Sequence, residues 1–158
     1  MTYTTADIPT QGLPDPAQRP DVYDGVVLKD GVVLKRALAW LFDILFVAIL
    51  ASLFLPFTAF LGVFFFPLMM LTIGFFYRWF TIGNRSATWG MRIMSIELRE
   101  ADGQRLSSGA AFLHTLGYTI SIGVSPLQLI SIALMLFTER KQGLTDLVMG
   151  TAMVNRLR

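Results

Sequence analysis

The chain has 158 residues, of which 54% are hydrophobic and only 15% are charged. Soluble domains carry about a quarter of charged residues, so this composition excludes an ordinary soluble domain and indicates a membrane protein. Because Cys is absent and there is a single His, disulfides and thiolate sites are excluded, and we expect no metal centre and no cofactor.

Charge is distributed unevenly along the chain. Residues 1–30 contain five acidic and two basic side chains, so the basic excess lies in the remainder. There the basic residues flank apolar runs, as they do in cytoplasmic loops of membrane proteins. They form no patch apart from these runs, so we expect the lipid bilayer as a partner and no nucleic acid.

Residues 1–31 are predicted to form a disordered acidic tail, since they contain four prolines and lack apolar periodicity. A tandem repeat of the sequence DGVVLK covers residues 24–29 and 30–35. It is either a local duplication in a linker or a segment that brings its lysines to the lipid headgroups. Residues 32–158 are predicted to form one transmembrane domain.

The first apolar run, residues 37–55, is about 28 Å long as a helix, which matches the hydrocarbon core of a bilayer. Pro56 ends it, and an uncharged turn leads to a second predicted span at 61–80. Basic residues lie before the first span and after the second, but not between them. The positive-inside rule therefore predicts a transmembrane helical hairpin with a cytoplasmic N-terminus.

Residues 83–107 are more polar. Apolar and polar side chains alternate approximately over residues 91–99, as in a half-buried strand, and Asp-Gly at 102–103 is a turn signal. We predict a small extended segment at the cytoplasmic surface. Its arginines either contact lipid phosphate or are simply solvated.

The last apolar run, residues 109–137, is too long for one upright span and too short for two. Gly123 and Pro126 interrupt it. We predict two short helices, 109–123 and 126–137, which bend back to the cytoplasmic side because the C-terminus is basic; one long kinked helix is the alternative. The predicted fold class is an all-α membrane protein, a transmembrane hairpin followed by a broken or returning third and fourth helix.

An aspartate inside the first span needs an explanation. Burying the charge of Asp43 in lipid costs about 2.5–3.5 kcal/mol. Arg36 lies on nearly the same helix face, about 10.5 Å away along the axis, so Asp146 is the easier partner for it. We predict a cluster of Arg36, Asp43 and Asp146, which is either an ionic lock (an ion-pair network that fixes helix packing) or a cation or proton site on Asp43. His114 and Gln128 are candidates for a polar path.

Three stretches resemble the RDD family of small bacterial membrane proteins, named for one Arg and two Asp. These are Arg36 with Asp43, the stretch SATWGMR at 86–92, which is similar to the family's TPGK turn, and QGLTDLVMGT at 142–151, which is similar to RQ-x-x-HD-x-x-x-GT. Met91 and Thr145 stand where the family usually has Lys and His. The resemblance covers about residues 33–155. It implies a multi-pass protein of the bacterial inner membrane, with a transport or accessory role.

No nucleophile–base pair, metal-ligand set or phosphate loop is visible, so we do not expect an enzyme. The predicted function is an accessory or packing subunit that contacts another membrane protein, or a second copy of itself, through its helices. The ionic cluster would then be a lock. The alternative is a component of a cation/proton transporter or antiporter that uses Asp43.

Overall fold

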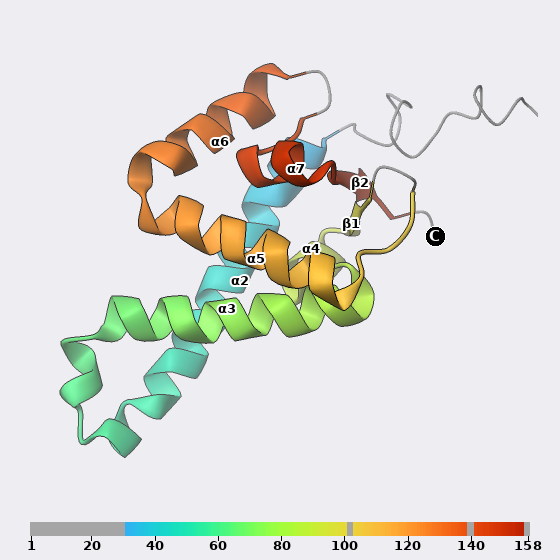
Figure 1. The fold of residues 1–158 in the computed structure, drawn as a ribbon. Coiled ribbons are helices and arrows are strands. Elements are labelled where there is room, and N and C mark those ends of the chain that lie inside the picture. Colours follow the sequence, from blue (N-terminus) through green and yellow to red (C-terminus); the bar gives the residue numbers. More distant parts are fainter. Residues whose placement is uncertain (1–30, 101–102, 139–140, 157–158) are drawn as a thin grey trace, which may run out of the picture.

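The computed structural model describes residues 31–100, 103–138 and 141–156, so the predicted tail lies outside it except for Gly31. The elements in chain order are α2 (Val32–Phe54), the short 3₁₀ helices η1 (Pro56–Thr58) and η2 (Leu61–Val63), α3 (Phe66–Arg85), α4 (Trp89–Ile93), β1 (Ile96–Arg99), α5 (Ser108–Gly123), α6 (Ser125–Phe137), α7 (Leu144–Met149) and β2 (Ala152–Asn155) (Figure 1). The fold is mostly helical, as predicted. It also contains a two-stranded sheet, which an all-α class lacks.

Helix α2 is about 34 Å long, enough to cross the hydrocarbon core. In the described part of the chain it is the one helix that by length and composition could cross a membrane alone. Its buried residues Ala39, Asp43, Val47 and Ala51 recur every fourth position, so a single stripe of α2 packs against the rest of the protein. The helix begins five residues before the predicted start at 37, since Lys35 and Arg36 are good helix formers.

Helix α3 follows the two 3₁₀ turns and packs across α2, and η1 and η2 join the two helices at one end of the molecule (Figure 1). The predicted second span at 61–80 is displaced, because α3 occupies 66–85. Pro67 explains the late start. It lies in the first turn, where its missing N–H removes no intrahelical hydrogen bond.

The stretch predicted to be extended contains a short helix before its strand. Thr88 caps α4 by accepting a hydrogen bond from Met91 N, and β1 follows at 96–99. β1 pairs antiparallel with β2, in a register that places Glu97 opposite Val154. The sequence pattern did not indicate β2. The sheet packs with the start of α2 in a buried apolar cluster that includes Val32, Ile82, Ile96, Leu98, Leu106 and Met153.

The predicted break in the last apolar run is present. α5 and α6 meet at an angle of 114°, and their bounds differ from the predicted 109–123 and 126–137 by one residue at each start. Pro126 lies in the first turn of α6. At about 24 Å and 20 Å, neither helix alone reaches the thickness of the hydrocarbon core. α5 packs along α3, and the chain returns through α7 to lie beside the start of α2 (Figure 1).

Candidate functional site

The second aspartate of the predicted cluster, Asp146, is 1% exposed and is surrounded by donors from several elements. Arg36 Nη1 donates to Oδ2 over 2.6 Å, and His114 Nε2 lies 2.8 Å from Oδ1. The backbone N–H of Gly143 and the hydroxyl of Thr151 complete the set, at 3.0 and 3.3 Å. Asp146 therefore joins α2, α5 and the start of α7.

These partners decide the charge of Asp146. Burial by itself would raise the pKa of the carboxyl group. The Arg36 guanidinium and the hydrogen bond from His114 outweigh burial and hold the pKa well below its usual range. Asp146 is therefore ionised at neutral pH, and His114 Nε2 must carry the proton that it shares with Oδ1.

Asp43 has a separate set of partners. The hydroxyls of Tyr77 and Thr88 donate to its two oxygens over 2.7 Å each, and the backbone N–H of Gly90 donates to Oδ1 over 2.9 Å. Arg78 Nη2 lies 3.5 Å from Oδ2. A single carboxylate in α2 thus holds α3 and the start of α4.

Gly90 makes this approach possible. A Cβ at this position would lie 2.2 Å from the carbonyl oxygen of Ala39 and 2.8 Å from Asp43 Oδ1. Only a residue without a side chain lets α4 come this close to the backbone of α2. The close packing of α4 on α2 therefore explains why the stretch at 86–92 has a glycine at position 90.

The three residues predicted to form one cluster are therefore divided between two centres. Arg36 and Asp146 are paired with each other, whereas the ion pair of Asp43 is with Arg78, which takes the place expected for Arg36. The axial offset between Arg36 and Asp43 on α2 explains the division, since each side chain meets different elements. The sequence did not predict the partners of Asp43, which are Tyr77, Arg78, Thr88 and Gly90; the Gly in the turn-like stretch was the available signal.

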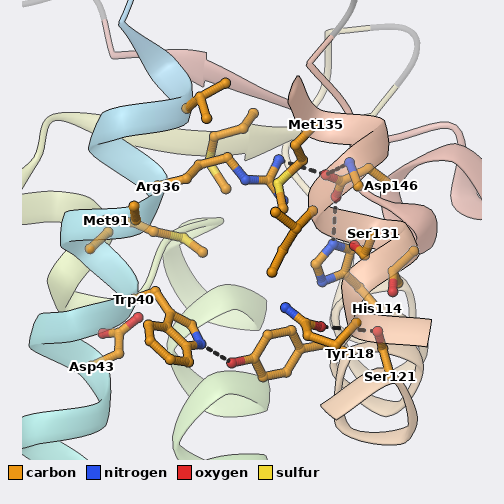
Figure 2. Close-up of a pocket in the computed structure, with 18 of the residues that line it drawn as sticks. Arg36, Trp40, Asp43, Met91, His114, Tyr118, Ser121, Ser131, Met135 and Asp146 are labelled. Atoms are coloured by element: carbon orange, nitrogen blue, oxygen red, sulfur yellow. Dashed lines mark hydrogen bonds and ion pairs between the residues drawn. The ribbon is translucent and has the colours of Figure 1, made fainter. Parts of the chain in front are cut away.

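The two centres lie on the walls of one cavity of about 400 Å³ between α2 and the helices α5, α6 and α7 (Figure 2). All five residues that the sequence singled out line it: Arg36, Asp43, His114, Gln128 and Asp146. Two further hydrogen bonds lie at its edge. Trp40 Nε1 donates to the Tyr118 hydroxyl over 2.7 Å, and Ser121 Oγ donates to Gln128 Oε1 over 3.0 Å.

Among known protein families, the model of the RDD family matches residues 31–150 of the chain. The chain belongs to the RDD family. The match extends from the start of α2 through α7 and includes Arg36, Asp43 and Asp146, so the resemblance noted in the sequence is confirmed. Family membership together with the apolar α2 makes this RDD protein a membrane protein. Comparison with curated proteins and with solved structures gives no significant match.

The surroundings of the two carboxylates show what a cation would meet in the cavity of this RDD protein. Within residues 31–100, 103–138 and 141–156, no three His, Asp or Glu side chains gather as metal ligands. Both carboxylates already accept hydrogen bonds from several donors of the chain itself. A cation entering the cavity would have to displace these donors to reach a carboxylate oxygen.

Proposed function

We propose that this RDD protein is a multi-pass accessory subunit of the bacterial inner membrane, with its N-terminus in the cytoplasm, that binds another membrane protein or a second copy of itself. The supporting observation is α6, in which only Ser131 is buried among 13 residues. Leu129 and Phe137 of α6 are 68% and 87% exposed. A short apolar helix packed mainly on α5 and α7 offers its outer face to lipid and to a partner helix.

The two carboxylate centres support this proposal as ionic locks. Asp146 ties α5 and α7 to α2, and Asp43 ties α3 and α4 to the same helix. Buried ionic groups add little net stability, but they favour one arrangement over others because leaving either partner unpaired is costly. In this role they hold α6 at a fixed position relative to α2.

Mass measurement after gentle solubilisation tests the accessory role. The subunit is expected to purify in a stoichiometric complex larger than its own 17.6 kDa. A double variant on α6, Leu129→Ala with Phe137→Ala, should release it. A matched double variant on α2, Leu45→Ala with Phe54→Ala, changes residues that are also exposed, at 58% and 53%, and should leave the complex intact. A monodisperse monomer carrying only lipid would contradict the proposal.

Transport of a cation or proton is the second candidate function. One observation favours it: the five polar residues proposed for a site or path all line the same cavity. A transporter of this kind would lose pH- or cation-driven flux in proteoliposomes when Asp43 is replaced by Asn, and would retain it in Glu100→Gln, which lies outside the cavity. Equal flux in Asp43→Asn and wild type would exclude Asp43 as the ion site.

A further inference from the structure

We infer that the cavity between α2 and α5–α7 binds a phosphate group carried by an amphipathic molecule, and that Arg78 receives the phosphate. This inference concerns a ligand of the protein. It stands apart from the accessory role, because it rests on the polar groups inside the cavity and not on the outer face of α6.

Arg78 is a buried cation whose N–H donors are largely unused. The residue is 8% exposed and lines the cavity. Its guanidinium lies 4.0 Å from the centre of the Tyr118 ring, and its one ion pair, with Asp43, is long at 3.5 Å. Among the described residues it donates no hydrogen bond, although a guanidinium carries five N–H donors. A buried charge of this kind is costly until an anion occupies its donors.

Asp43 does not remove this demand. Its oxygens already accept hydrogen bonds from Tyr77, Thr88 and Gly90, all of which are shorter than the distance to Arg78. The carboxylate is therefore stabilised chiefly by neutral donors, and the guanidinium remains free to form the two-pronged contact with phosphate for which its planar shape is suited.

Other polar groups on the cavity wall also have hydrogens that are available to donate to a ligand. The oxygens of Tyr118, Gln128 and Ser131 each accept a hydrogen bond, from Trp40 Nε1, Ser121 Oγ and Leu144 N respectively. Their remaining hydroxyl or amide hydrogens can point to a ligand. With the carboxylates occupied, the wall presents mostly unused donors. This favours a ligand rich in acceptor oxygens, as phosphate is.

One ring nitrogen on the cavity wall also has unused hydrogen-bonding capacity. His114 Nδ1 is buried and has no hydrogen-bond partner in the described part of the chain, because the ring meets Asp146 through Nε2. A phosphate headgroup that also carries hydroxyls offers both donors and acceptors to such a nitrogen. Glycerol phosphate is a headgroup of this kind.

The rest of the wall is apolar, with Val33, Ala37, Ile132, Met135 and Leu136. These side chains suit the first carbons of a lipid tail. About 400 Å³ is within the usual range of small-molecule pockets and is enough for a headgroup, not a whole phospholipid. The α2 residues that line the cavity, from Val33 to Asp43, occupy about the first 15 Å of that helix. This is the end of α2 that the sequence predicts to be cytoplasmic, and basic pockets between helices on that side bind lipid headgroups.

Binding of defined probes to the purified full chain in non-ionic detergent tests the inference. The probes are phosphatidylglycerol, a diacylglycerol with the same tails but no phosphate, and inorganic phosphate, measured by native mass and by titration. Phosphatidylglycerol should bind, and diacylglycerol should bind at least tenfold more weakly. If the ligand is a lipid, inorganic phosphate competes only at much higher concentration. If inorganic phosphate displaces the lipid at a concentration comparable with that of the lipid, the Arg78 site binds free phosphate and the lipid part of the inference is wrong.

The variants separate the site from the fold. Arg78→Gln should weaken phosphatidylglycerol binding at least tenfold, and Arg78→Lys less. Arg85→Gln, at an exposed arginine on the same helix, should leave binding unchanged. If Arg78→Gln does not fold, Gln128→Leu removes a donor without touching the ion pair and should weaken binding severalfold. Equal binding in a folded Arg78→Gln and in Arg85→Gln, or equal binding of diacylglycerol, would overturn the inference.

Discussion

Replacing Gly90 by Ala tests the contact between α4 and α2 more directly than any change of charge. The added Cβ would lie 2.2 Å from the carbonyl oxygen of Ala39, which is backbone and cannot rotate away. Relief requires α4 to move outward. Such a movement lengthens the hydrogen bond from Gly90 N to Asp43 Oδ1, now 2.9 Å, and loosens the one from Thr88.

The magnitude follows from these two effects. Overpacking a tight contact costs about 1–3 kcal/mol, and losing a hydrogen bond to a buried charge costs about 1.5–3 kcal/mol. The two effects add to about 2.5–6 kcal/mol of destabilisation for Gly90→Ala, which at about 2–4 °C per kcal/mol for a chain of this length lowers Tm by roughly 5–24 °C.

Thermal unfolding of the purified protein in detergent measures this difference. Gly109→Ala is the matched control, because a Cβ there meets nothing within 4 Å and the residue lies in helix α5. Its Tm should be equal to that of wild type or slightly higher, since Ala is the better helix former. Equal Tm values for Gly90→Ala and Gly109→Ala would show that α4 does not depend on close approach to α2.

Three further predictions concern the two carboxylate centres and the sheet. Thr88→Val should lower stability by about 1–3 kcal/mol, because it removes both the hydrogen bond to Asp43 and the cap of α4. Thr72→Val is the control and should leave stability unchanged, because it removes only a hydrogen bond within its own helix. Similar Tm values for the two variants would refute the prediction. The pKa of Asp146 is lowered in the folded state, so the stability that its charge contributes is complete above the ordinary Asp pKa of about 3.9 and is lost as pH falls below it. Between pH 7 and pH 3, Tm should therefore fall less for Asp146→Asn than for wild type. Parallel plots of Tm against pH would contradict the assignment. Pairing of β1 with β2 predicts that cysteines introduced at Arg92 and Arg156 are labelled from the same side of membrane vesicles; labelling from opposite sides would exclude the sheet.

The two centres also change how the residues that name the family relate to one another. Arg36 and one aspartate form a pair at the start of α2, while the other aspartate is bound mainly by hydroxyls and a backbone N–H. Loss of Arg36 therefore removes the guanidinium paired with the buried Asp146, but leaves the partners of Asp43 in place. Variants at these positions are expected to differ in effect.

The sequence by itself determined the presence of the long apolar helices and the break between α5 and α6. Runs of apolar residues, interrupted by Pro and Gly, carry that information locally, which is why the predicted bounds at 109–123 and 126–137 differ little from the observed ones. The sequence also showed that Asp43 needs partners, since a charge in an apolar helix is costly wherever the helix lies.

Only the tertiary structure decided which partners Asp43 has. Thr88 and Gly90 lie 45 and 47 residues away, in a short helix whose position depends on the absence of a side chain at Gly90. The pairing of β1 with β2 is equally non-local, because its hydrogen bonds join residues 96–99 with 152–155. Helical periodicity depends on residues that are close in the sequence and therefore predicts local secondary structure. Hydrogen bonds between distant segments depend on how the whole chain packs, which periodicity does not show.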